Sequence, residues 1–145
     1  MHESIVFCST CTMSSYRKFT FAVSSPDVFL VLCCCEATDN SCGFVVFTTK
    51  SNLVTLCNAD VITMDGTFRV CPKFFHQLYT IHGYLNEHYI PLVHCLLSHK
   101  AMATYVRMLN TIQSNCAAIN LCFSPQDAVV DFEISMLAAV DSTLL

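Results

Sequence analysis

The chain has 145 residues, a length that corresponds to about one domain and that suffices to bury one hydrophobic core. Although 54% of the residues are hydrophobic, the longest apolar run, residues 28–35, is far below the roughly 18 residues of a membrane-spanning helix, which excludes such a helix. The formal charge is −4, with only 7 Lys plus Arg, so the chain alone is not expected to grip a nucleic-acid backbone. If it acts on DNA, other segments or metal ions must help.

Residues 1–42 form an N-terminal extension in which few elements can be predicted. The start, Met1-His2-Glu3-Ser4, lacks the basic residues of a secretory signal, so the 11 cysteines are expected to be thiols of an intracellular, reducing compartment. A zinc site could combine the C-x-x-C pair with later cysteines: Cys8, Cys11, Cys33, Cys34, Cys35 and Cys42. The spacing departs from that of known zinc knuckles, which favours incidental thiols. Residues 19–23 and 28–35 are predicted strands because of their β-branched and aromatic content.

Residues 43–145 show a clearer pattern, which we interpret as the main domain. A strand is predicted over residues 44–48 and a short helix over residues 52–58, with Ser51 as its N-cap. The strand that carries Asp65 follows, and Cys71-Pro72 interrupts the pairing after it. Two more strands, separated by a polar turn at Leu85-Asn86-Glu87, complete a three-stranded antiparallel meander: residues 74–83 and 88–97.

The last third of the chain is predicted to contain two helices around one short strand. A helix over residues 100–116, capped by Ser98, places apolar residues on one face: Met102, Tyr105, Val106, Leu109, Ile112 and Cys116. The run 128–130 is a predicted strand that ends in Asp131. A second helix is predicted over residues 132–140. Its apolar residues are expected on one face: Phe132, Met136, Leu137 and Val140. The order β-β-β-α-β-α predicts an α/β fold with a mixed sheet.

Two carboxylates, Asp65 and Asp131, are the principal candidate site residues. Each follows an apolar strand, and a strand reached through a helix lies parallel to a strand of the same sheet, so both are expected at one sheet edge. Paired carboxylates repel unless a cation neutralises them, and Mg²⁺ is the natural occupant. The alternative is purely structural: a hairpin turn at Asp65-Gly66 and an N-cap at Asp131.

The histidines and cysteines give weaker indications. His76, His82, His88 and His94 lie six residues apart and could form a ladder of imidazoles across the sheet, although ordinary strand histidines are the simpler interpretation. A Cys-His hydrolase would need a thiolate in an electropositive pocket, and no cysteine is distinguished by its neighbours. The 3 glycines do not suggest a phosphate-binding loop.

A long tract of the chain resembles the core of Mutator-like element (MULE) transposases. The resemblance covers about residues 44–140 and rests on four stretches: Met64-Asp65-Gly66-Thr67-Phe68 with Cys71-Pro72 and Phe75, residues 77–83, Tyr89-Ile90-Pro91-Leu92, and Asp131-Phe132-Glu133. It implies a ribonuclease H-like fold and an Asp, Asp, Glu triad that holds two magnesium (or manganese, Mn²⁺) ions and cleaves and joins DNA at transposon ends. By resemblance the first two acidic residues are Asp65 and Asp131, and a functional transposase derivative would be nuclear.

The third acidic residue of that family has no counterpart here. The family's Glu lies on a helix well past the second Asp, whereas Glu133 is two residues beyond Asp131 and Asp141 belongs to the helix that follows immediately. Neither matches, so the chain is interpreted as a truncated transposase core, with catalysis not expected in isolation. The high hydrophobicity is expected to promote self-association. The alternative is a non-catalytic, transposon-derived remnant or interaction module.

Overall fold

The computed structural model describes residues 29–35, 42–73 and 75–144, the first of these stretches and Cys42 by their backbone only. The elements in chain order are β1 (Phe29–Cys35), β2 (Cys42–Thr49), α1 (Lys50–Cys57), β3 (Val61–Thr67), β4 (Gln77–Leu85), β5 (His88–Leu97), α2 (Met102–Ala118), β6 (Asp127–Val130) and α3 (Ile134–Thr143). The predicted strand at residues 19–23 lies outside the described residues. The predicted run 28–35 corresponds to β1, and the expected order of elements after it is confirmed.

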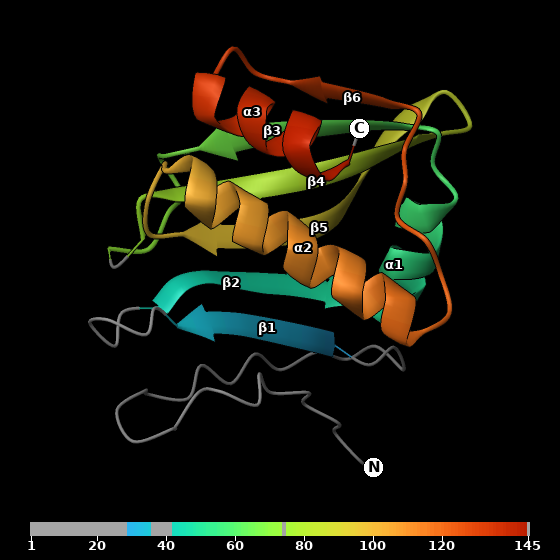
Figure 1. The fold of residues 1–145 in the computed structure, drawn as a ribbon, viewed down its shortest axis with the longest axis horizontal. Helices are drawn as coiled ribbons and strands as arrows, with labels where there is room; N and C mark the ends of the chain where they lie inside the picture. Colours follow the sequence, from blue (N-terminus) through green and yellow to red (C-terminus); the bar gives the residue numbers. More distant parts are fainter. Residues whose placement is uncertain (1–28, 36–41, 74, 145) are drawn as a thin grey trace.

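The strands form one mixed sheet in the order β1-β2-β5-β4-β3-β6. Neighbouring strands are antiparallel except for β3 and β6, which are parallel. The predicted meander β3-β4-β5 is therefore confirmed, and α2 carries the chain back across the sheet to β6. Figure 1 shows all three helices on the same side of the sheet, with α2 lying across its middle.

The hydrophobic core lies between the sheet and these helices. The strands alternate, so that β3 buries Ile62 and Met64 while β4 buries Tyr79 and Ile81. Helix α2 buries one face against them: Thr104, Tyr105, Met108, Leu109, Ile112 and Cys116. The predicted face of α2 is correct in its centre, but Met102, the first residue of the helix, is exposed. No helix among the described residues is long and apolar enough to cross a membrane.

The helix starts differ from those predicted. Thr49, and not Ser51, caps α1, because its Oγ1 accepts a hydrogen bond from the Asn52 N–H at 3.1 Å. Ser98 does not cap α2, since its hydroxyl donates instead to the Gly43 carbonyl at 2.9 Å, between β5 and β2. Helix α3 begins at Ile134, so Phe132 lies outside it and is 96% exposed instead of sharing its buried face. Leu137 is also exposed, whereas Met136 and Val140 are buried as expected.

Candidate functional site

Asp65 lies near the carboxyl end of β3, inside the strand. It pairs with Thr80 of β4, and the pairing continues through Gly66 with Tyr79 and Thr67 with Leu78. The alternative of a hairpin turn at Asp65-Gly66 is therefore wrong, because the strand runs on past both residues. Asp65 is exposed and has the opposite parity to the buried Ile62 and Met64. The sequence thus places a carboxylate on an apolar strand without burying it.

Gly66 allows an unusually close approach between β3 and β4. A Cβ atom at this position would lie 2.8 Å from Oε1 of Gln77 and 3.1 Å from the ring of Tyr79. A contact of 2.8 Å is closer than real Cβ atoms come, so any side chain here would displace Gln77 or Tyr79. The residue after Asp65 is therefore glycine for a steric reason, and no positive φ is involved.

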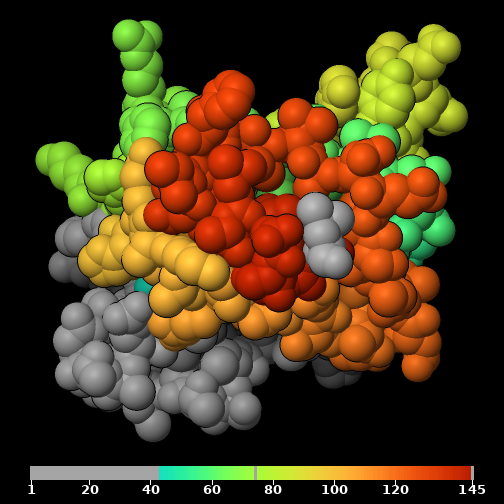
Figure 2. All heavy atoms as spheres, turned by 45° about the horizontal axis from the view of Figure 1, so that its top comes forward, coloured from blue at the N-terminus to red at the C-terminus, as the bar shows by residue number. Residues whose placement is uncertain are grey.

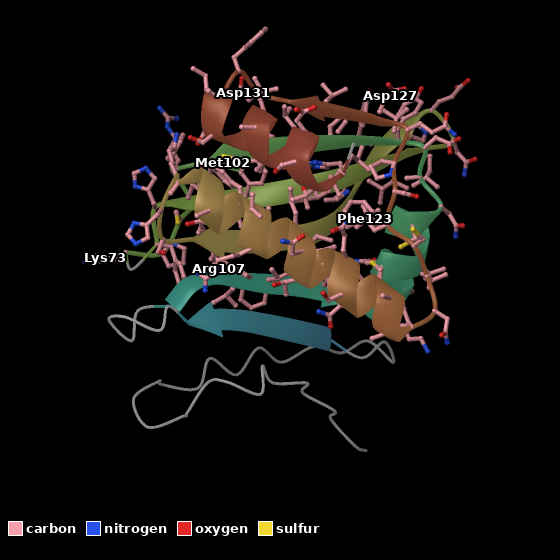
Figure 3. All side chains as sticks on the ribbon, in the orientation of Figure 1. Lys73, Met102, Arg107, Phe123, Asp127 and Asp131 are labelled. Atoms are coloured by element: carbon pink, nitrogen blue, oxygen red, sulfur yellow. The ribbon has the colours of Figure 1, made fainter. Side chains whose placement is uncertain are left out.

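Asp131 directly follows β6, the strand parallel to β3. The last pair in that register is Met64 with Val130, so Asp65 and Asp131 are the next residues on two adjacent strands. Adjacent strands lie about 4.8 Å apart, so the two backbones come together at the carboxyl ends of β3 and β6, as predicted. Figure 3 labels Asp131 and Asp127 at opposite ends of β6.

Asp131 does not cap α3, contrary to the structural alternative. The N-cap position is Glu133, and Oδ1 of Asp131 accepts a hydrogen bond from the N–H of the next residue, Phe132, at 2.8 Å. Asp131 is exposed. In the described part of the chain, Lys100 forms an ion pair with Glu133. Neither Asp65 nor Asp131 has a basic partner among these residues.

Glu133 belongs to a polar network on the helix side of the sheet. The Tyr105 hydroxyl donates to its Oε1 at 2.6 Å, the Gln77 Nε2 donates to the Tyr105 oxygen at 2.5 Å, and the Lys100 Nζ lies 3.6 Å from Oε2. Lys100 also lies over the Phe68 ring, 4.2 Å from its centroid. Both carboxylate oxygens of Glu133 are thus engaged by α2 and the segment before it. Apart from the short spacing between Asp131 and Glu133, no sequence pattern indicates this network.

The charged groups of the site affect the pKa of Tyr79, whose ring lies beside Gly66. Burial raises the pKa of its phenol well above the usual value, and further increases come from Tyr105, Glu133, Asp65 and Asp131. Burial also raises the pKa of Tyr105, with the hydrogen bond to Glu133 as the next cause. Both phenols are therefore neutral at ordinary pH, and three carboxylates, one from β3 and two from the segment between β6 and α3, lie within electrostatic reach of Tyr79.

The four histidines do not form the ladder considered as an alternative, although two of them come together. His82 and His94 lie on the same sheet face, and burial, followed by the charge of His82, lowers the pKa of His94. Nδ1 of His94 lies 3.4 Å from the Thr80 hydroxyl, while Nδ1 of His82 is buried without a partner. His76 packs instead against Phe68, and His88 starts β5 beside the turn.

No group of three or more His, Cys, Asp or Glu residues that could hold a metal ion occurs among the side chains that the structure describes. The zinc hypothesis for Cys8, Cys11, Cys33–Cys35 and Cys42 falls on side chains outside that description. Of the acidic residues singled out from the sequence, Asp65 and Asp131 have no basic partner in the described chain, whereas Glu133 is held by Tyr105 and Lys100.

Fold and site together define a mixed α/β protein with two exposed carboxylates at one edge of its sheet. In comparisons with known proteins, no family model, no curated protein and no solved structure matches the chain. Function must therefore be argued from the geometry of the chain itself.

Proposed function

We propose that this chain is the core of a MULE-type transposase, with a ribonuclease H-like sheet on which Asp65 and Asp131 hold a divalent metal ion. The topology supports the proposal: an antiparallel meander, β3-β4-β5, is followed by the crossover helix α2 and by a strand parallel to β3. This is the order of elements that the resemblance implies for such a core. The strand β1 adds a sixth strand beyond β2.

The observation that carries the proposal is the position of the two carboxylates. Asp65 and Asp131 are far apart in sequence, but each lies one residue beyond the Met64–Val130 pair at the same end of parallel strands. Ligands of open α/β sheets gather beyond such carboxyl ends. Both side chains are exposed and lack a basic partner in the described chain, which leaves two negative charges at adjacent strand ends for a cation to neutralise.

Magnesium, or manganese in its place, suits this pair of ligands. Mg²⁺ is commonly bound by one or two carboxylates, with waters and substrate phosphates completing its octahedral shell. Such an ion, when bound, would stabilise negative charge on the phosphodiester during cleavage. It would also lower the repulsion between DNA and a chain whose formal charge is −4. The substrate class proposed is DNA at transposon ends, which would place a functional protein in the nucleus.

Strand transfer by this chain alone is not part of the proposal. The third carboxylate expected from the resemblance has no counterpart in the sequence, and Glu133 is already held by Tyr105 and Lys100. Two carboxylates hold one metal ion better than two, so charge stabilisation at a scissile phosphate is incomplete. We therefore expect metal binding that depends on Asp65 and Asp131, with little or no nuclease activity.

The proposal is tested by titrating the protein with Mn²⁺. Calorimetry measures the heat of binding, and electron paramagnetic resonance measures the free ion. Asp65→Asn and Asp131→Asn should each weaken binding by at least about tenfold, because each removes one of two charged ligands. Asp127→Asn is the matched control, since Asp127 is an exposed carboxylate at the other end of the same strand. Equal Mn²⁺ affinity in all four proteins would refute a site at this edge.

The second candidate function is a non-catalytic interaction module, and one feature of the surface favours it. We define the edge patch as the exposed apolar residues of β6, of α3 and of the segment between them: Val129, Phe132, Ile134 and Leu137. Phe132 and Ile134 are 96% and 82% exposed, values unusual for large apolar side chains that have no partner to cover them. Figure 2 shows the red segment of α3 at the surface of the molecule. Because β6 is also an edge strand, self-association through this patch is the expected interaction.

A further inference from the structure

Three cysteines from separate parts of the chain meet at the end of the molecule opposite Asp131. Cys57 is the last residue of α1, Cys116 lies in the last turn of α2, and Cys122 belongs to the linker that leads to β6. The Leu121 N–H donates to the Cys116 carbonyl at 2.9 Å, which turns this linker back over the end of α2. Figure 3 shows yellow sulfur atoms beside the labelled Phe123, between α1 and the end of α2.

The three thiols differ in their access to solvent. Cys122 is exposed, Cys57 is half-buried and Cys116 is fully buried. The Cys122 sulfur lies 3.6 Å from the Ser124 hydroxyl, also at the surface. A small oxidant arriving from solvent therefore meets Cys122 first, because oxidation of a thiol requires access as well as thiolate character.

Cys57 and Cys116 differ as partners for Cys122, because a hydrogen bond joins their two side chains. Burial raises the pKa of Cys57, but the Cys116 thiol donates a hydrogen bond to the Cys57 sulfur and so favours its thiolate. Burial raises the pKa of Cys116, and the hydrogen bond to Cys57 adds to this increase because it favours the protonated thiol, so that the pKa reaches about 12. The charge of Cys122 acts on both, as expected for neighbouring groups. Cys57 is only half-buried whereas Cys116 is fully buried, so Cys57 is both the more accessible and the better nucleophile of the two neighbouring thiols.

We propose that Cys122 and Cys57 form a redox modification site: hydrogen peroxide oxidises Cys122, and Cys57 then closes a disulfide with it. The Cys122 thiolate attacks a peroxide oxygen, the O–O bond breaks and hydroxide leaves, so that Cys122 becomes a sulfenic acid. Cys57 attacks the oxidised sulfur, an S–S bond forms, the S–O bond breaks and hydroxide again leaves. With the two thiol protons, the products are one disulfide and two waters.

The remaining cysteines with described side chains do not share this arrangement. Burial is the cause that raises the pKa of Cys71 and of Cys95, and no other cysteine contributes to either shift. Cys71 is partly exposed in the loop between β3 and β4, so it serves as a control for accessibility without a thiol neighbour. The disulfide would join the end of α1 to the linker that positions β6, the strand before Asp131.

Peptide mapping of the whole chain after peroxide treatment tests the proposal. The protein is treated with hydrogen peroxide, free thiols are blocked with N-ethylmaleimide, and trypsin digestion is followed by mass spectrometry. Cleavage after Lys50, Arg69 and Arg107 places Cys57 and Cys122 in separate peptides, residues 51–69 and 108–145. We expect these peptides to be cross-linked, to separate on reduction, and to give fragment ions that locate the bridge at Cys122 and leave Cys116 blocked.

Two variants and one control complete the experiment. Cys122→Ser should abolish the cross-link, while Cys57→Ser should leave a Cys122 sulfenic acid that dimedone traps. Cys71→Ser should cross-link like the wild type. A bridge from Cys57 to Cys116, a cross-link that survives in Cys122→Ser, or over-oxidation of Cys122 with Cys57 left blocked would each overturn the proposal. Because the fragment ions come from the wild-type chain, the result stands even if Cys57→Ser folds poorly.

Discussion

At the scale of single residues, Tyr105 contributes most to the organisation of the site. Its hydroxyl accepts from Gln77 of β4 and donates to Glu133, so one oxygen joins the sheet, α2 and the segment that follows Asp131. Gln77 and Tyr105 are both buried. The sequence predicted that Tyr105 faces the core, but the hydrogen bonds could not be predicted, because they depend on how three separate segments meet.

Tyr105→Phe is expected to destabilise the protein by about 1–3 kcal/mol, the cost of leaving buried polar groups without partners. Both the Gln77 amide and one Glu133 oxygen lose a partner, while the ring still fills its place in the core. Urea unfolding followed by circular dichroism measures the change. Tyr84→Phe is the control, since Tyr84 is exposed on the same strand as Gln77. A Tyr105→Phe variant within about 0.5 kcal/mol of the wild type would contradict the role assigned to this hydroxyl.

At the scale of elements, the periodicity of apolar residues predicted all the strands and helices from residue 43 onward. The alternation of β4 and the three- and four-residue steps of α2 are strong patterns, because each of these elements buries one face against the same core. The element ends were predicted less well. Thr49 caps α1, Ala101 precedes α2 without a side-chain cap, and α3 starts two residues later than expected. Caps depend on local backbone angles and competing tertiary hydrogen bonds, which hydrophobic patterns do not encode.

The β4–β5 hairpin contains a local strain that sequence alone does not show. Its two-residue turn, Asn86-Glu87, has φ angles of 48° and 65°, as in a type I′ turn. Asparagine tolerates a positive φ, but glutamate does not favour it. Glu87→Gly should therefore stabilise the protein by about 0.5–1 kcal/mol, with the unfolding midpoint in urea as the measurement.

Glu87→Ala provides the matched control for that prediction. It removes the same charge but keeps a Cβ atom, so the strain at positive φ remains and little stabilisation is expected. If the alanine variant gained as much stability as the glycine variant, loss of the charge would be the cause and the explanation by strain would be wrong.

At the scale of the whole molecule, the central feature is that one crossover brings Asp65 and Asp131 to the same sheet edge. This juxtaposition could be predicted, because a strand–helix–strand connection fixes the direction of β6 relative to β3. The contacts of Glu133 and the meeting of Cys57, Cys116 and Cys122 could not, since they depend on distances between side chains of separate elements. Sequence patterns therefore predicted the frame of the candidate site better than its polar interior.

The edge patch leads to a prediction about assembly. Phe132 and Ile134 project from the molecule next to the short edge strand β6, so burying them against a second copy would remove apolar surface from water and cover the strand edge. Sedimentation velocity over a range of concentrations should show self-association of the wild type. Phe132→Ser combined with Ile134→Ser should shift the protein toward monomer.

Tyr89→Ser is the control for this assembly, because Tyr89 is 55% exposed but lies at the β4–β5 hairpin, away from the edge patch. It should associate like the wild type, whereas a general effect of surface hydrophobicity would weaken association in both variants. A wild type that stays monomeric at all concentrations would remove the support for the interaction module. The metal site at Asp65 and Asp131 would be unaffected by that result, because neither residue belongs to the patch.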